Sequence, residues 1–159
     1  MKKSYIRELA LEYAYKWALK RNPKYYNYDN LGGDCTNFIS QCIFAGSKVM
    51  NYTKTFGWYY NNANDKSPSW TGVDFLYKYL TRKDGIGPIG KIVNKEEIKL
   101  ADIVQLAFEG DKFAHSLIVT KLENNRIYVS SHTLDNLNKP LENYNYSSIR
   151  FIHIEHVNL

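Results

Sequence analysis

The stretch Leu31-Gly32-Gly33-Asp34-Cys35-Thr36-Asn37-Phe38-Ile39-Ser40-Gln41-Cys42, residues 31–42, combines a tight turn with the start of an apolar helix. The glycine pair allows a sharp turn. Asp34 follows it at the position of a helix N-cap, where its carboxylate can accept a backbone N–H of the first turn. The predicted helix is apolar on one side and ends near Gly46. Its first turn holds Cys35, so a thiol lies at a helix start.

Outside this stretch the first half of the chain alternates between helices and loops. Ser4–Arg21 has apolar residues at steps of three and four, which predicts an amphipathic helix ended by Pro23. Residues 51–70 are aromatic and polar without a clear period, which indicates a long ordered loop. A short helix is predicted at Val73–Leu80, and the glycines and proline of residues 85–90 then predict irregular structure.

The second half of the chain predicts strands. They cover Asp102–Leu106, Ala114–Thr120, Ile127–His132 and Ser148–Ile154, with turns at residues 109–111 and 124–125. Helices first and an antiparallel meander second indicate an α+β fold. We therefore expect residues 1–159 to form one domain, with N-terminal helices packed on a C-terminal antiparallel sheet or half-barrel.

Composition limits the class of protein. With 44% hydrophobic and 15% aromatic residues, the chain can bury a core and is not expected to be disordered. The net charge of +5 is scattered, so no nucleic-acid partner is expected. Charges interrupt the first twenty residues, and no segment reaches the roughly 20 apolar residues of a membrane span. We expect a cytoplasmic location without a membrane partner, and secretion by another route stays open.

The two cysteines are expected to remain free thiols. Seven residues apart on one helix, at about 1.5 Å per residue, their Cα atoms would lie roughly 10 Å apart. A disulfide tolerates at most about 7 Å. Free thiols suit a reducing compartment or a catalytic role. Cys42 lies on the apolar side of the helix and is interpreted as an inert, buried thiol.

Cys35 is the candidate nucleophile. At the first turn of a helix, free backbone N–H groups and the helix dipole favour an anion, which predicts a lowered pKa for the Cys35 thiol. The alternative is a small residue of the core, because free cysteine is often buried.

A nucleophilic cysteine needs a base that a third polar group orients. His115 opens an apolar strand just past a hairpin turn and is the candidate base. The next predicted strand ends at His132, which adjacent antiparallel strands could bring within hydrogen-bonding distance of His115. Asp135 is the alternative for this orienting role.

Five segments of the chain resemble the putative amidase domain family: Asp34–Gln41, Gly57–Tyr60, Ser67–Val73, Phe113–Thr120 and Ser131–Asp135. That family is similar to the NlpC-type and CHAP-type cysteine peptidases and amidases of the papain-like superfamily. The NlpC-type pattern has Asp-Cys-Ser-Gly-Phe opening a helix, then a histidine at the start of a strand, then a polar residue, often histidine, on the next strand. Cys35, His115 and His132 follow this order.

The resemblance implies a papain-like fold and cleavage of an amide bond in a peptide or amide substrate, with a peptidoglycan-type peptide of a bacterial cell wall as one option. Cys35 would form a thioester, His115 would carry the proton, and His132 would hold the His115 ring. The backbone N–H of Cys35 and a donor from the preceding loop, for which Tyr28 is the candidate, would bind the oxyanion. No cofactor and no metal are implied. Thr36-Asn37 replaces the Ser-Gly of the pattern and predicts a bulkier pocket beside Cys35.

Other chemistry-bearing residues have plainer interpretations. Large aromatics in a small domain usually fill the core, although a glycan-stacking role is the alternative for Trp58, Tyr59, Tyr60 and Trp70. His153 and His156 lie three apart on a predicted strand and point to opposite faces, so they make a poor metal pair. The acidic residues Glu96, Glu97 and Asp102 are interpreted as surface charges.

Two further functions remain open at this point. One is a binding module that keeps the scaffold without turnover. The other is an acyl transferase, which shares the thioester and passes the acyl group to an amine. The sequence contains no pattern that indicates an oligomeric state.

Overall fold

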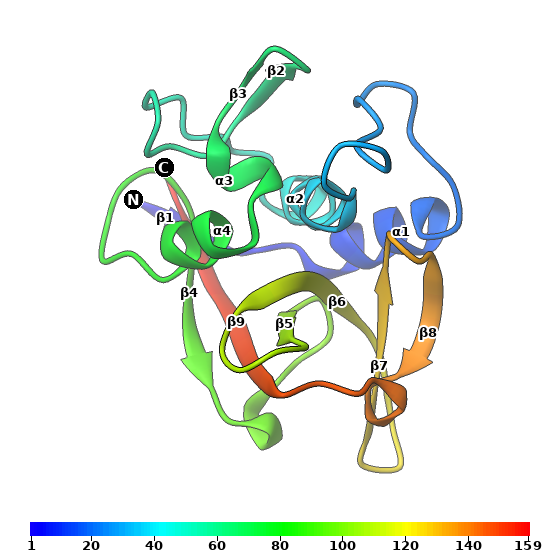
Figure 1. Ribbon diagram of the computed structural model, residues 1–159. Helices are drawn as coiled ribbons and strands as arrows, with labels where there is room; N and C mark the ends of the chain where they lie inside the picture. The colour runs from blue at the N-terminus through cyan, green and yellow to red at the C-terminus, as the bar shows by residue number, and fades with distance from the viewer.

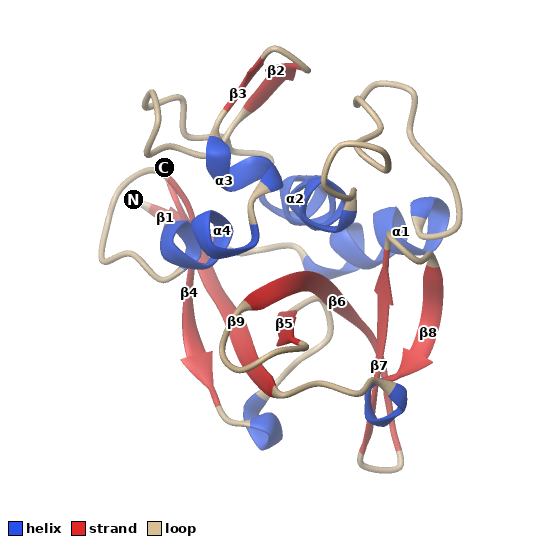
Figure 2. Cartoon of the chain, viewed as in Figure 1, coloured by secondary structure: helices blue, strands red, loops and turns tan.

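The α-helices lie on one side of a curved sheet in the computed structural model, which describes residues 1–159 (Figures 1 and 2). The helices are α1 (Arg7–Trp17), α2 (Cys35–Ser47), α3 (Pro68–Thr71) and α4 (Val73–Leu80), and two short 3-10 helices are η1 (Lys95–Glu97) and η2 (Leu141–Asn143). The strands are β1 (Lys2–Lys3), β2 (Tyr60–Asn62), β3 (Asp65–Lys66), β4 (Gly87–Val93), β5 (Ile103–Ala107), β6 (Phe113–Glu123), β7 (Arg126–Ser131), β8 (Asn136–Pro140) and β9 (Ser148–Asn158).

The main sheet is antiparallel throughout. Its strand order is β1-β9-β5-β6-β7-β8, and β4 also pairs with β9. Strands β5, β6 and β7 form the predicted meander. The predicted strand at Ser148–Ile154 lies in β9, which pairs with β5, and β8 was not predicted. Asn124 and Asn125, at φ 52° and 61°, make the tight turn between β6 and β7 that their sequence predicts. The α+β class with an antiparallel sheet is therefore confirmed.

The helix predictions differ in accuracy. Val73–Leu80 has the predicted bounds, and α2 starts at Cys35 as expected and ends one residue after Gly46. The first helix covers Arg7–Trp17 and is shorter than the predicted Ser4–Arg21 at both ends, so Pro23 is not what ends it.

Two segments without a regular pattern are nevertheless ordered elements. Residues 85–90 were expected to be irregular, yet β4 begins there, and its glycine lets β9 approach closely. A Cβ at Gly90 would lie 2.8 Å from the His153 carbonyl oxygen. Residues 51–70, predicted to be a loop, contain the β2–β3 hairpin and most of α3. Tertiary contacts rather than local periodicity stabilise these short elements.

Apolar side chains cover both faces of the sheet. One face packs against the helices, and alternate residues of the same strands form a second cluster on the opposite face that includes Val104 and Leu117. Trp58 and Trp70 are completely buried in the apolar cluster that the helices form with this face of the sheet. For these two aromatics the core interpretation is confirmed and the glycan-facing alternative is wrong.

The two ends of the chain lie side by side (Figure 1). Strand β1 pairs with the end of β9, and the backbone N–H of Leu159 donates to the Met1 carbonyl at 3.0 Å. None of the helices has the length and hydropathy that crossing a bilayer requires.

Candidate active site

Cys35 is the first residue of α2, with Asp34 at the N-cap as predicted. The Asp34 carboxylate, however, makes no capping bond to the helix. Its Oδ1 instead accepts the backbone N–H of Tyr28 at 2.8 Å and the Asn37 amide at 2.9 Å. The Asp34 backbone N–H donates to Thr133 Oγ1 at 3.0 Å. Asp34 therefore ties the turn before Cys35 to the segment after β7.

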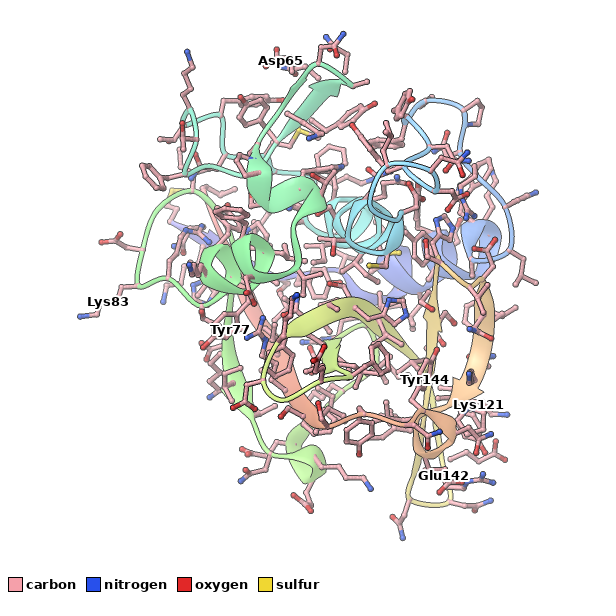
Figure 3. The ribbon with its side chains drawn as sticks, in the orientation of Figure 1. Asp65, Tyr77, Lys83, Lys121, Glu142 and Tyr144 are labelled. Carbon is pink, nitrogen blue, oxygen red and sulfur yellow. The ribbon has the colours of Figure 1, made fainter.

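Cys35 and His115 line the same cavity, which has a volume of about 400 Å³. Its wall also includes the Gly32-Gly33 turn and residues from four other places in the chain, namely Phe108, Ala114, Thr133, Leu134, Asn136, Lys139 and Tyr144. Tyr144 lies beside η2, where Figure 3 labels it. A larger hollow of about 530 Å³ lies at the β6–β7 hairpin but contains neither a cysteine nor a histidine. The cavity at Cys35 is therefore the one that can support nucleophilic chemistry.

The expected lowering of the Cys35 pKa is wrong. Burial raises the pKa of this thiol, which is only 7% exposed. A backbone hydrogen bond from Ser116 and one from the Thr36 hydroxyl, at 3.8 Å from the sulfur, oppose the rise without cancelling it. The free protein therefore holds Cys35 as a neutral thiol at neutral pH. Cys42 is completely buried and, as predicted, both thiols are free.

His115 lies on β6, opposite Leu106 of β5, and its ring centroid is 6.3 Å from the ring centroids of Phe108 and Tyr144. Burial lowers the pKa of His115 to about 4, and the positive charge of Lys139 adds to this effect. The ring is therefore neutral at pH 7 and able to accept a proton. It makes no direct hydrogen bond to Cys35.

His132 does not contact His115. Its Nδ1 lies 2.6 Å from Asp34 Oδ2, and its Nε2 lies 2.8 Å from the Trp17 carbonyl oxygen, so both ring nitrogens are occupied. The ring is 1% exposed and stacks on Phe38 at 4.0 Å. Because a carbonyl only accepts, Nε2 must carry a proton.

The strand register explains why the two histidines separate. Ile118 of β6 pairs with Ser130 of β7, so the same register places His132 opposite Ser116. Ser116 faces α2, where its Oγ lies 2.9 Å from Thr36 Oγ1. Neighbouring residues of a strand point to opposite faces, so His132 lies on the face that packs against the helices. His115 lies on the other face, near the start of β6, where it lines the cavity together with Cys35.

Asp135 and Tyr28 are also engaged elsewhere. Asp135 forms an ion pair with Arg21 at 2.9 Å and makes no contact with His115. The Tyr28 hydroxyl points to the Ala63 carbonyl at 3.5 Å, and Tyr28 is absent from the cavity wall. Neither residue is in place for the orienting or oxyanion role that the sequence suggested.

Arg21 connects several of these polar groups. Its guanidinium contacts Asp29 and Asp135 at 2.9 Å, and its Nε lies 3.5 Å from Asp34 Oδ2. Together with His132, these four residues form a network, here called the Asp34 network, that joins α1, the loop before α2 and the loop after β7. No local sequence pattern predicts this network, because its members are far apart in the chain.

The pocket beside Cys35 is not narrowed by Thr36 and Asn37, contrary to expectation. Thr36 bonds to Ser116, and Asn37 accepts the indole N–H of Trp70 at 3.0 Å and donates to the Tyr26 carbonyl at 2.9 Å. Both side chains point into the protein rather than into the cavity. Asn37 therefore anchors α2 to α3.

Asp102 is a buried residue rather than the predicted surface charge. It is 0% exposed, accepts from Arg7 at 2.8 Å, and lies 2.7 Å from His153 Nδ1. These contacts give His153 a structural role at the β5–β9 pairing. We find no group of three or more His, Cys, Asp or Glu residues with metal-binding geometry.

The buried His115 makes stability depend on pH. Its ring is neutral in both states above about pH 6.5, the ordinary value for histidine. Between pH 6.5 and about 4 the unfolded chain binds a proton that the folded chain does not. The free energy of unfolding should therefore fall as pH is lowered, by on the order of 3 kcal/mol. Chemical denaturation across this range should show a smaller loss for His115→Gln than for the wild type. An unchanged loss in His115→Gln, with His156→Gln as the matched control, would contradict the burial of a neutral ring.

Comparisons with known proteins identify relatives of this chain. Residues 4–154 match the family model of the putative amidase domain. The chain is 35% identical over 136 residues to the uncharacterized protein YhbB of Bacillus subtilis (strain 168), covering 82% of this chain and 42% of that protein. It is 32% identical over 148 residues to the uncharacterized protein YjcM of the same organism, covering 88% of this chain and 34% of that protein.

The chain thus spans less than half the length of these curated relatives. No solved structure matches it. The family match extends from α1 through most of β9 and includes both cavity residues Cys35 and His115. The chain therefore belongs to the putative amidase domain family, whose description indicates hydrolysis of amide carbon–nitrogen bonds.

Proposed function

We propose that this protein is a cysteine-dependent amidase or peptidase that cleaves an amide bond through a thioester on Cys35. One observation carries the proposal: a thiol at a helix start and a neutral imidazole line a single cavity of about 400 Å³. The raised pKa of Cys35 and the lowered pKa of His115 favour a neutral pair over a preformed thiolate–imidazolium pair.

In the proposed reaction, His115 accepts the thiol proton as Cys35 Sγ bonds to the amide carbonyl carbon. The backbone N–H of Cys35 starts α2 and is free of a helical partner, so it can donate to the oxyanion. The carbon–nitrogen bond then breaks, and His115 returns the proton to the leaving amine. Water, deprotonated by His115, attacks the thioester and releases a carboxylic acid and the free thiol. Hydrogen bonds between catalytic groups often form only when substrate is bound.

We assign His132 a positioning role instead of the orienting role expected from the sequence. Its pairing with Asp34, and the bond from Asp34 to Thr133, hold the start of α2 against the segment after β7. These contacts keep Cys35 and the cavity wall at Thr133 in fixed positions relative to each other.

A papain-like fold, related to the NlpC-type and CHAP-type enzymes, is part of the proposal. Its support is the arrangement of a cysteine at the start of a buried helix that packs on an antiparallel sheet, with the histidine on a strand of that sheet. The substrate class we propose is a peptide or a related amide, with a peptidoglycan-type peptide as one member.

A binding module on the same scaffold is the second candidate. The missing Cys35–His115 hydrogen bond and the raised Cys35 pKa are properties of an unreactive thiol, and they favour this alternative. An acyl transferase would share the thioester and differ in the acceptor that releases it.

An acyl-enzyme experiment separates the first two candidates. Incubation with p-nitrophenyl acetate should give a burst of p-nitrophenolate, and intact-mass analysis should find one acetyl group, mapped to Cys35 by peptide digestion. Cys35→Ala should lose the burst, and Cys42→Ala, if its melting shows it is folded, should keep it. A wild type without burst or adduct would favour the binding module. Faster loss of the adduct with an added amine than with water would favour acyl transfer.

A further inference from the structure

The cavity at Cys35 contains one unpaired positive charge. Among its lining residues only Lys139 is charged at neutral pH, since His115 is neutral and the wall includes no carboxylate. Lys139 lies on β8, opposite Val129 of β7, and is half-buried. Its amine forms no ion pair and instead rests over the Tyr144 ring, 4.2 Å from the ring centroid.

Two exposed lysines of the sheet give a contrast. Lys121 pairs with Glu123 at 2.9 Å, and Lys91 pairs with Glu155 at 3.5 Å. Both are exposed, and a solvated cation gains little from a ligand. Lys139 is partly removed from water and held over an aromatic face. A bound anion would therefore form the ion pair that no carboxylate of the protein makes with Lys139.

The other residues of the cavity wall indicate what the uncharged part of a ligand would be. Phe108 is 50% exposed and Leu134 is 85% exposed, so both present apolar surface at the cavity. A Cβ at Gly32 would meet no atom within 4 Å, so the turn before Cys35 leaves open space. The wall therefore suits a ligand with an apolar body and one anionic end.

We propose that Lys139 binds a carboxylate of the substrate, so that the amides cleaved at Cys35 carry a carboxylate on the acyl or amine part next to the scissile bond. This inference rests on the proposed function for its reaction, but the subsite itself rests on the cavity alone. The positive charge of Lys139 also helps to hold His115 neutral. A bound carboxylate would neutralise that charge and make His115 a stronger base when substrate is present.

A pair of matched alkylating reagents tests the subsite without any turnover. Iodoacetate and iodoacetamide alkylate the same sulfur by displacement of iodide, and they differ in one carboxylate. We expect Lys139→Met to lower the ratio of the iodoacetate rate to the iodoacetamide rate at Cys35 by about tenfold, the effect of one hydrogen bond to a charged group. The ratio cancels any general change in thiol reactivity. Lys139→Arg should keep the wild-type ratio, and Lys121→Met is the control for a lysine outside the cavity.

The outcomes distinguish this inference from the proposed function. An unchanged ratio in Lys139→Met would overturn the carboxylate subsite even if the acyl-enzyme burst is observed. A lowered ratio with no burst would retain the subsite and reject hydrolysis. Protection of Cys35 from iodoacetamide by acetate, lost in Lys139→Met, supports a carboxylate ligand. Stronger protection by inorganic phosphate than by acetate would overturn the carboxylate assignment.

Discussion

Asp34→Asn is expected to lower the free energy of unfolding by about 2–3 kcal/mol, because it replaces a buried carboxylate that contacts Arg21 and His132 and accepts the Tyr28 N–H. Asp34 and His132 are each 1% exposed, with their oxygen and nitrogen 2.6 Å apart. The carboxylate also faces the Nε of Arg21 at 3.5 Å. Guanidinium denaturation at pH 7 measures the loss, and thermal melting should fall by roughly 10 °C.

Asp29→Asn is the matched control for this prediction. Asp29 binds the same Arg21 at 2.9 Å, but its side chain is 36% exposed. An exposed pair contributes about 1 kcal/mol or less. If Asp34→Asn were no less stable than Asp29→Asn, the Asp34 network would not hold the start of α2, and the positioning role of His132 would be withdrawn.

His115→Ala is expected to slow acylation of Cys35 by about 10²–10⁴-fold, the usual contribution of a general base. The loss should be large because burial raises the Cys35 pKa, so few molecules carry a thiolate without help. Stopped-flow measurement of the p-nitrophenolate burst gives the rate, and the wild-type rate should fall as pH drops toward about 4, where His115 becomes protonated.

Two controls separate this effect from a packing defect. His156→Ala alters a histidine near the end of β9 that makes no side-chain hydrogen bond, and it should leave the acylation rate unchanged. His115→Gln keeps most of the buried volume and should be as slow as His115→Ala. Wild-type acylation rates in both His115 variants would mean that another group removes the proton.

The helix start at Cys35 could be predicted because its signals are local. The turn glycines, the N-cap position of Asp34 and the apolar spacing of α2 all lie within a few residues, and so do the signals for α4. Strand β4 could not be predicted, because Gly90 indicates irregular structure until β9 lies against it. Its order comes from a partner strand some sixty residues later in the chain, which no local pattern contains.

The candidate site could also be predicted only in part. Cys35 and His115 lie where the spacing of turn, helix and strand puts them, at one cavity. The role of His132 depended on which face of β7 it occupies, and a difference of one residue in register reverses that face. No sequence pattern indicates that Lys139 lines the cavity, because β8 was not predicted and a single lysine resembles any surface charge.

The hydrogen bond between the two ends of the chain has a practical use in protein engineering. Met1 and Leu159 are hydrogen-bonded to each other at the β1 edge of the sheet, whereas the cavity draws on β6 and β8 toward the other edge. A tether or a fused domain attached there would leave the sheet away from the cavity at Cys35. A short linker could close the backbone into a ring, and new termini could be opened at the exposed Asn124-Asn125 turn without cutting a strand.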